Sequence, residues 1–528
     1  MARRPIPALA LAAAGMVAAM PAGAEPLSAI DWLSDSVKPA ARSATPAAQV
    51  GAAQAPTARA DGSALPDTVT VTRLQRPAPD AAGLMPAAAI GLPAGLWGNS
   101  DPEVLKQLLA VDASTALPAV RDLLRDLLTA EFTPPPGTDG RSLFLARVDA
   151  LLAMGDLDAA SRLLARAEPT EPEIFRRRFD VALLRGHEGD ACADLDRALR
   201  VTPTYAARIF CLARGGDWSA AALTLETAAA LGLLDADQDG LLARFLDAGL
   251  AEGAPPLSLP RQPTPLTFAL FEAIGEPLPT APLPLALAHA DLRPMTGWKA
   301  RIVAAERLAR SGVLPAAPLF ALYAERRPAA SGGVWDRVAA AGALTGALAA
   351  GDAEGVAAAL PDAYAQMRAA GLDMALAQHL GAALADMPLD GAARDVALRL
   401  GLLSDAYEAV ARQVGPNAPA DLAAAAEIAQ GRVPRTPSEG PGGAQRGAAL
   451  TAAANAAFAS PTPPPRLAAL VDDGRLGEAI LRAAQMAAPG RAGDPEALSQ
   501  ALALFLSVGL EQTARRAAIQ LLLLDGPR

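Results

Sequence analysis

Three glycines at nearly equal spacing constrain the fold of this chain more than any other feature of its sequence. Gly155, Gly186 and Gly216 are 31 and 30 residues apart, and each follows an apolar segment. Small or apolar residues recur 5, 9 and 12 positions after each glycine. Because these offsets differ by 4 and 3, the side chains share one face of a helix. The pattern predicts antiparallel helices joined at each glycine, and such hairpins must stack to bury their apolar faces.

This pattern resembles the tetratricopeptide repeat. The residues at the three offsets are Ala160, Leu164 and Ala167, then Ala191, Leu195 and Ala198, then Ala221, Leu225 and Ala228. The second copy matches the family most fully, because Leu199 and Pro203 also fit its pattern. The chain lacks the bulky first-helix tryptophan and the paired Leu-Gly of the family, and its period is shorter than the family's length of about 34 residues. The resemblance implies an all-α fold, a right-handed α-α superhelix of helical hairpins with a concave binding face.

Composition also indicates an all-α protein. Hydrophobic residues make up 52% of the chain but aromatic residues only 4%, so alanine and leucine carry the apolar content. Both are strong helix formers, whereas the β-branched and aromatic residues that favour strands are scarce. Weaker copies of the glycine pattern predict further hairpins, at Gly312, Gly351, Gly401, Gly474 and Gly509.

The first 24 residues have the layout of a secretory signal peptide. Arg3 and Arg4 precede the apolar run of residues 8–20, and small residues then lead to a predicted cleavage site between Ala24 and Glu25. The apolar run is shorter than a transmembrane helix needs, and no later stretch reaches 18 uninterrupted apolar residues. We therefore expect a mature chain that begins at Glu25, has no membrane span and lies in the periplasm.

Proline- and glycine-rich stretches divide the chain into blocks. We expect a flexible tether over residues 25–91, tetratricopeptide-like repeats over 92–255, a second helical block over 265–433, a linker over 434–465 and C-terminal hairpins over 466–528. Within the tether, residues 28–37 contain the amphipathic sequence Ile30-Asp31-Trp32-Leu33. This segment is either a remnant of the mature N-terminus or a short linear motif that binds a partner.

The two cysteines, Cys192 and Cys211, lie on either side of a predicted turn between two repeats. Residues equidistant from the turn of an antiparallel helix pair lie side by side, and export brings them into an oxidising compartment. We therefore predict a disulfide between them, with two buried free thiols as the alternative. Their spacing is not Cys-x-x-Cys, so we do not expect a catalytic dithiol.

Asp235, Asp237 and Asp239 precede Gly240 in a D-x-D-x-D-G sequence, which is typical of a calcium-binding loop. However, Leu246 stands at the twelfth position, where such a loop needs a bidentate glutamate. The alternative is an acidic helix start, in which the carboxylates cap backbone amides.

Other polar clusters have simpler interpretations. Arg176, Arg177 and Arg178 form a short basic run that we expect on a solvated helix face, the alternative being an anion or partner site. The three histidines lie far apart, so they do not predict a zinc site. We expect four tryptophans to pack between hairpins, with a surface role for one as the alternative: Trp97, Trp218, Trp298 and Trp335.

The expected function is a periplasmic protein-interaction scaffold whose partner is another envelope protein. A net charge of −10 argues against nucleic-acid binding. We find no nucleophile elbow, Walker loop or dinucleotide-binding motif, so we expect neither an enzyme nor a cofactor. Two alternatives stay open: a peptidoglycan-associated enzyme with a helical superstructure, and a calcium-dependent surface protein.

Overall fold

The computed structural model describes residues 30–34, 36, 78–110, 116–167, 171–197, 203–251, 256–433 and 444–524. Within these ranges the secondary structure is almost entirely helical, which confirms the predicted all-α class. The exception is a pair of two-residue strands, β1 (Met85–Pro86) and β2 (Ala130–Glu131), which pair in parallel.

The three predicted repeats are helical hairpins. They consist of α3 (Ser142–Ala153) with α4 (Leu157–Leu164), α5 (Pro172–Leu184) with α6 (Glu188–Arg197), and α7 (Tyr205–Arg214) with α8 (Trp218–Ala230). The turn glycines Gly155, Gly186 and Gly216 have φ angles of 80°, 75° and 85°, a left-handed conformation that glycine adopts without a steric penalty. In two of the hairpins an aspartate caps the second helix: Asp156 accepts from the amide of Ala159, and Asp217 from that of Ala220.

The remaining helices complete a chain of hairpins. Before the repeats come the 3-10 helices η1 (Pro79–Ala81) and η2 (Ala87–Ile90), then α1 (Pro102–Leu109) and α2 (Pro118–Thr129). After them come α9 (Ala236–Leu246), η3 (Ala248–Ala251), α10 (Pro265–Ala273), η4 (Leu285–Leu292), α11 (Trp298–Arg310), α12 (Ala316–Ala324), α13 (Val334–Ala349), α14 (Ala353–Ala369), α15 (Asp373–Ala385), α16 (Gly391–Leu403), α17 (Tyr407–Ala411) and α18 (Ala420–Ala429). The C-terminal part contains α19 (Ala444–Ala459), α20 (Pro465–Asp472), α21 (Leu476–Ala487), η5 (Gly490–Ala492), α22 (Pro495–Ser507) and α23 (Glu511–Leu523).

Most of the weaker glycine copies are also turns. Gly312, Gly351, Gly474 and Gly509 all have positive φ. Gly401 does not form a turn, and that prediction was wrong: it lies inside α16, where the side chain of Val410 packs against it. Here glycine serves the close approach of two helices rather than a change of chain direction.

Two predicted boundaries were wrong. Residues 434–465, predicted as a linker, contain α19, because the alanine-rich stretch between the prolines is a strong helix former. The tether was predicted to reach residue 91, but residues 78–91 pack on the body of the protein. There the buried guanidinium of Arg147 donates to the carbonyl oxygens of Ala82, Leu128 and Ala130, at 2.8, 2.8 and 2.9 Å. The rest of the predicted tether, apart from residues 30–34 and 36, lies outside the described residues.

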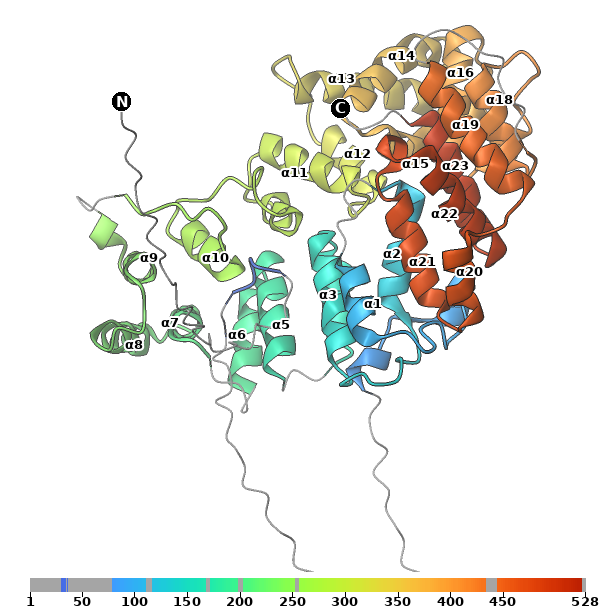
Figure 1. Cartoon of the computed structure of the whole chain (residues 1–528). Coiled ribbons are helices and arrows are strands. Elements are labelled where there is room, and N and C mark those ends of the chain that lie inside the picture. Colours follow the sequence, from blue (N-terminus) through green and yellow to red (C-terminus); the bar gives the residue numbers. More distant parts are fainter. Residues whose placement is uncertain are drawn as a thin grey trace, which may run out of the picture.

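The first and last helices of the described chain pack together, and Figure 1 shows α20–α22 beside α1 and α2. The amide of Ala119 on α2 donates to the buried side chain of Gln520 on α23, at 2.9 Å. Gly477 on α21 packs against the ring of the buried Trp97, and its amide donates to the carbonyl oxygen of Leu96 at 2.9 Å. The helical array is therefore closed between its two ends.

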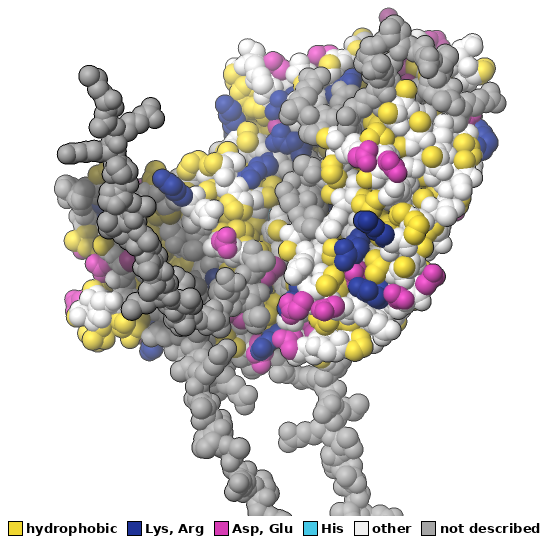
Figure 2. All heavy atoms as spheres, in the orientation of Figure 1, with side chains coloured by type: hydrophobic (Ala, Val, Ile, Leu, Met, Phe, Trp, Pro, Cys, Tyr) yellow, Lys and Arg dark blue, Asp and Glu magenta, His cyan; other side chains and the backbone are white. Residues whose placement is uncertain are grey.

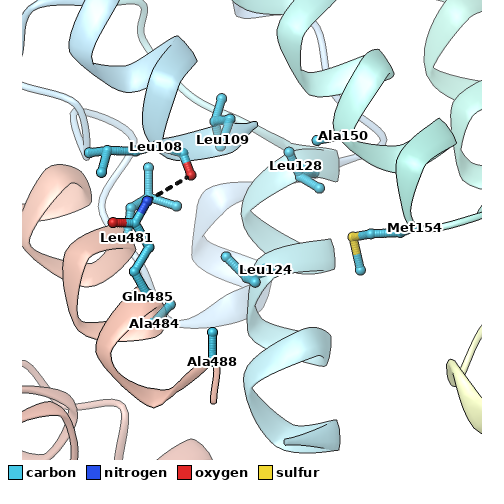
Figure 3. Close-up of a pocket in the computed structure, with 10 residues that line it drawn as sticks. All are labelled: Leu108, Leu109, Leu124, Leu128, Ala150, Met154, Leu481, Ala484, Gln485 and Ala488. Atoms are coloured by element: carbon cyan, nitrogen blue, oxygen red, sulfur yellow. Dashed lines mark hydrogen bonds between the residues drawn. The ribbon is translucent and has the colours of Figure 1, made fainter. Parts of the chain in front are cut away.

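A small apolar cavity lies in this seam between α1, α2, α3 and α21 (Figure 3). Its volume of about 20 Å³ is room for a single water molecule. It is lined largely by leucine and alanine side chains, with the Gln485 side chain donating to the carbonyl of Leu108 at 3.4 Å. The cavity is too small to hold an organic ligand.

The helix η4 joins the repeats to the second half of the chain. His289 Nε2 lies 2.8 Å from the carbonyl oxygen of Gly155, at the end of α3. Arg293, just after η4, donates to the carbonyl oxygen of Leu183 near the end of α5, at 3.0 Å. Both contacts are made to carbonyl oxygens at the C-terminal ends of the first helices of two hairpins, where side chains often bind the last carbonyls. The orientation of two neighbouring hairpins is thus fixed by one crossing segment.

Replacing Gly477 by alanine should destabilise the protein. The added methyl group would overlap the Trp97 ring, and overpacking of this kind costs about 1–3 kcal/mol. Urea unfolding measures the change. The control is Gly342→Ala, at a helical position with open space around it, where alanine should leave the free energy of unfolding unchanged or raise it by up to ~1 kcal/mol. If the two substitutions changed the free energy of unfolding equally, the close packing of Gly477 against Trp97 would be contradicted.

Candidate functional site

A short segment from far earlier in the chain lies against the repeats. We call residues 30–34 and 36 the docked segment, and it lies among α5, the start of α7 and the start of α10. Figure 1 shows it as a dark blue trace next to α5 and α10. We call the surface that holds it the segment groove: Arg176 and Asp180 on α5, Thr204 before α7 and Leu266 on α10.

The segment groove binds main-chain atoms of the docked segment. Arg176 donates from Nε to the carbonyl oxygen of Ser34 and from Nη2 to that of Leu33, at 2.6 and 2.9 Å. The amide of Ser34 donates to Asp180 Oδ2 at 2.7 Å. The amide of Thr204 donates to the carbonyl oxygen of Ser36 at 3.0 Å. Main-chain recognition of this kind holds a peptide whatever its side chains are.

One side-chain contact adds sequence dependence. The amide of Leu266, in the first turn of α10, donates to Ser34 Oγ at 3.0 Å. First-turn amides of a helix have no partner within the helix, so a hydroxyl oxygen at this place satisfies a free donor. Ser34 is therefore bound through its amide, its carbonyl and its hydroxyl.

The apolar side chains of the docked segment are buried. Ile30, Trp32 and Leu33 are 8%, 8% and 2% exposed and belong to the main hydrophobic core, whereas Asp31 is exposed. Burying each such side chain contributes about 1.5–3 kcal/mol. The amide of Leu33 lies 3.5 Å from the carbonyl oxygen of Ile30, so the apolar residues form a turn before the chain continues through Ser34.

Asp180 is a buried acid at the centre of the site. Burial raises its pKa from the usual 3.8 to about 7, and the hydrogen bonds from Ser34 and the charges of Arg176 and Arg177 oppose this rise. Its Oδ1 is buried and has no hydrogen-bond partner among the described residues. The carboxyl group therefore takes up a proton near neutral pH.

Arg177 anchors the helix that carries these groups. Its guanidinium is fully buried and forms two hydrogen bonds to Asp149 on α3, at 2.6 and 2.7 Å. It also donates to the carbonyl oxygen and to Oε2 of Glu173, both at 3.0 Å. The prediction of a solvated basic face was wrong for Arg176 and Arg177, because the docked segment and Asp149 bury them. Arg178 remains partly exposed and pairs with Asp194 at 2.8 Å.

The space next to Ser34 continues as a cavity of about 280 Å³. It is lined by residues from the starts of α7 and α10 and from α9, among them Tyr205, Gln238, Leu241 and Thr267. Both hydrophobic and hydrogen-bonding groups line it, and Ser34 of the docked segment is one of its lining residues. A peptide longer than the docked segment has room to extend here.

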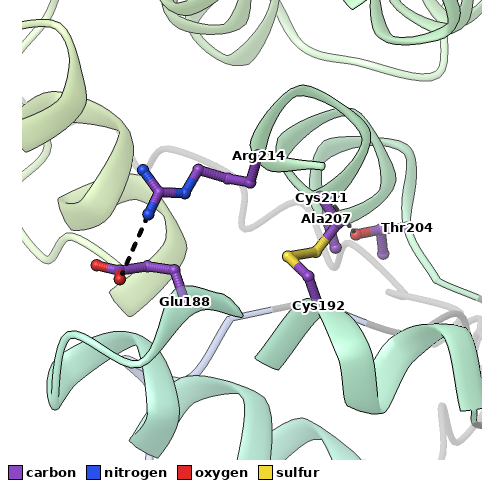
Figure 4. The surroundings of a disulfide bond; sticks show 6 residues. All are labelled: Glu188, Cys192, Thr204, Ala207, Cys211 and Arg214. Atoms are coloured by element: carbon purple, nitrogen blue, oxygen red, sulfur yellow. Dashed lines mark hydrogen bonds and ion pairs between the residues drawn. A yellow bond between two sulfur atoms is a disulfide. The ribbon is translucent and has the colours of Figure 1, made fainter. Parts of the chain in front are cut away.

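The disulfide between Cys192 and Cys211 is present, as predicted, with the two Cα atoms 5.2 Å apart. Figure 4 shows that it joins α6 to α7, and that Arg214 on α7 reaches Glu188 on α6 at 3.7 Å. The bond holds the second repeat to the third, close to Thr204, which contacts the docked segment.

Of the two interpretations of Asp235, Asp237 and Asp239, the structure agrees with the helix start and not with the calcium loop. Asp235 is the N-cap of α9 and accepts from the amide of Gln238 at 2.7 Å, while Asp237 and Asp239 lie in the first turn of the helix. Residues two apart on a helix point in different directions, so their carboxylates do not converge. Within the described ranges, no group of three His, Cys, Asp or Glu side chains is placed to hold a metal ion.

The tryptophans and histidines have separate environments. Trp97 is buried, and Trp298 and Trp335 pack against each other with centroids 5.0 Å apart. Trp218 is 51% exposed, but its ring also packs against Phe245 on α9, with centroids 6.2 Å apart. His289 binds the turn at Gly155, and His379 stacks on Phe320. The predicted cleavage site, Ala24 and Glu25, lies outside the described residues.

Sequence reasoning missed Asp180 and Leu266 as functional residues. The signal for Asp180 is the spacing of Arg176 and Asp180 by four positions within an apolar helix, which places a cation and an acid on one face. No local signal in the sequence marks Leu266. Its role depends on the contact between the first turn of α10 and the docked segment, which is far away in sequence.

Comparison with protein-family models, curated proteins and solved structures finds no match for this chain. In the part of the chain that the structure describes, every helix is too short or too polar to cross a membrane.

The pH dependence of stability should carry the signature of Asp180. The unfolded chain loses this proton near pH 3.8, whereas the folded protein keeps it to about pH 7. Folding therefore takes up a proton between these values, and the free energy of unfolding falls as pH rises from about 4 to 7. One such group changes the free energy of unfolding by at most about 1.4 kcal/mol for each pH unit.

Asp180→Asn keeps the oxygen acceptor for Ser34 and should remove this part of the slope. Urea unfolding at several pH values from 5 to 8 measures it. Asp237→Asn, at an exposed position, is the matched control and should keep the wild-type slope. An unchanged slope in Asp180→Asn would show that the carboxyl group is ionised throughout.

Loss of the disulfide should weaken the join between the second and third repeats. Closing a loop of 19 residues contributes about 3 kcal/mol. Reduction, or replacement of both cysteines by alanine, should lower the free energy of unfolding by that amount. The double variant should show no response to reductant. A wild-type protein equally insensitive to reductant would contradict the assignment.

Proposed function

We propose that this chain is an exported helical-repeat scaffold that binds another protein of the cell envelope. The observation that carries the proposal is the segment groove, which holds a peptide segment through its main chain. The docked segment is more than 140 residues away in sequence from Arg176 and Asp180, with which it pairs. Recognition of a short segment by a stack of helical hairpins is how repeat proteins use their concave surfaces.

Placement in the periplasm rests on the signal-peptide pattern of residues 1–24 and on the disulfide. A disulfide persists in oxidising compartments such as the periplasm and is rare in the cytosol. The bond between Cys192 and Cys211 is therefore compatible with export. The resemblance to tetratricopeptide repeats supports the other part of the proposal, the binding of a protein, since such repeats bind protein ligands.

Exposed apolar side chains near the segment groove provide further surface for a partner. Hydrophobic side chains reach the surface over the α7–α9 end of the molecule (Figure 2). Trp218, Leu223 and Leu231 are 51%, 65% and 62% exposed, and Leu233, which is 49% exposed, also lines the cavity next to Ser34. Exposed apolar residues that continue from a groove are typical of protein-binding surfaces, and tryptophan is frequent among their strongest contacts.

Crosslinking in intact cells tests the proposal. The tagged full chain is crosslinked, purified and analysed by mass spectrometry, alongside two variants with one added tryptophan each. Gln238→Trp fills the cavity next to Ser34 from an exposed position on α9. Glu226→Trp places the same side chain on the exposed face of the neighbouring α8 and is the control.

We expect one dominant envelope protein with the wild type and with Glu226→Trp, and at least a tenfold loss of it with Gln238→Trp. A chain that captures no partner would contradict the scaffold function. Capture of glycan fragments in place of a protein would favour an envelope enzyme.

A further inference from the structure

The hydrogen bonds that hold the docked segment are of the kind that a groove makes to a bound peptide. Arg176, Asp180 and Thr204 bind its main-chain atoms, and the Leu266 amide binds the hydroxyl of Ser34. None of these contacts requires the segment to be covalently connected to the groove. A separate peptide with the same residues would present the same atoms.

The connection between the docked segment and the rest of the chain is long. Residues 37–77, 41 in number, separate Ser36 from Ala78, where the described chain resumes. A chain of this length reaches up to about 140 Å when extended. Such a length permits the segment to leave the groove and return to it without unfolding the repeats.

We propose that the segment groove is an exchangeable peptide-binding site, occupied in this structure by the chain's own docked segment, residues 30–34 and 36. Its external ligand is a partner's peptide that carries the same chemistry: a turn with a large apolar residue, a tryptophan and a leucine, followed by a serine. This inference rests on the proposed function and names the class of partner that the scaffold binds. The chain's own segment acts as a competitor that a partner must displace.

Specificity comes from three features of the groove. The burial of Trp32 and Leu33 selects large apolar side chains, while the exposed Asp31 leaves its position free to vary. The hydrogen bond from the Leu266 amide to Ser34 Oγ selects serine. The cavity that Ser34 lines has room for further atoms of a bound peptide.

A synthetic peptide of residues 28–37 tests the exchange in purified protein. It carries a fluorescent label and is added to the full chain from residue 25, in which a protease site has been placed between residues 55 and 60. The protein folds with its connection intact and is cut afterwards. Fluorescence anisotropy measures peptide binding before and after the cut, and circular dichroism checks the fold.

The connection raises the local concentration of the resident segment to about 1 mM. For an intrinsic dissociation constant of roughly 10 μM, the labelled peptide should therefore bind the uncut chain about 100-fold more weakly than the cut chain. Peptides with Trp32→Ala or Ser34→Ala should bind the cut chain more weakly, by about 100-fold and 10-fold respectively.

A second variant empties the groove without a cut. The full chain with Trp32→Ala and Leu33→Ala should bind the labelled peptide as well as the cut chain does. Asp31→Ala, at the exposed position of the same segment, is the matched control and should bind it as weakly as the uncut wild type.

Three results would overturn the inference: unfolding of the cut chain, no binding to either the cut chain or the emptied variant, or equal binding before and after the cut. The first two would make the docked segment a permanent part of the core. The experiment needs no cellular partner, so its failure is separate from that of the crosslinking experiment. If a partner is captured while the peptide does not exchange, the scaffold stands and the segment groove is not its binding site.

Discussion

The buried ion pair between Arg177 on α5 and Asp149 on α3 is the contact on which the site depends. Both guanidinium–carboxylate hydrogen bonds are short, and Arg177 is fully buried. Two charges removed from water are stable only when geometry and hydrogen bonding are favourable, so the pair allows little freedom in how these helices pack. Arg176 and Asp180 lie on the same helix, and the orientation that Arg177 fixes presents them to the docked segment.

Buried arginines have a common role along this chain. Arg147 binds the carbonyl oxygens of Asp80 and Ala82 and those at the end of α2, and Arg176 binds those of the docked segment. Arg293 binds carbonyls at the end of α5. A core of alanine and leucine offers few hydrogen-bond partners, so a planar group with five donors satisfies backbone oxygens that non-helical segments and helix ends bring inside. The same chemistry that holds the fold together thus recognises the main chain of a bound segment.

The sequence predicted what local spacing determines. The hairpins at Gly155, Gly186 and Gly216 and the pairing of Cys192 with Cys211 follow from helical periodicity and a short turn. Features that depend on distant partners were predicted wrongly. Arg176 and Arg177 looked like surface residues because neither the docked segment nor Asp149 is close to them in sequence.

Composition misled in a similar way at other positions. The prolines around α19 suggested a linker, although the alanines between them form a helix. The carboxylates of Asp235, Asp237 and Asp239 suggested a metal loop, although the helix they begin points them apart. The packing of the first helices on the last could not be predicted, because it joins residues about 400 positions apart, such as Ala119 and Gln520.

Hydrogen exchange of residues 30–34 in the intact chain tests the central claim most directly. The amide of Ser34 donates to a buried carboxyl group, and the neighbouring Trp32 and Leu33 side chains lie in the core. The account predicts that a peptic fragment covering these residues exchanges at least tenfold more slowly than the same sequence as a free peptide. It also predicts that the protection falls when free peptide is added in excess. Exchange at the rate of the free peptide would contradict the docking of this segment and, with it, the binding site proposed for the protein.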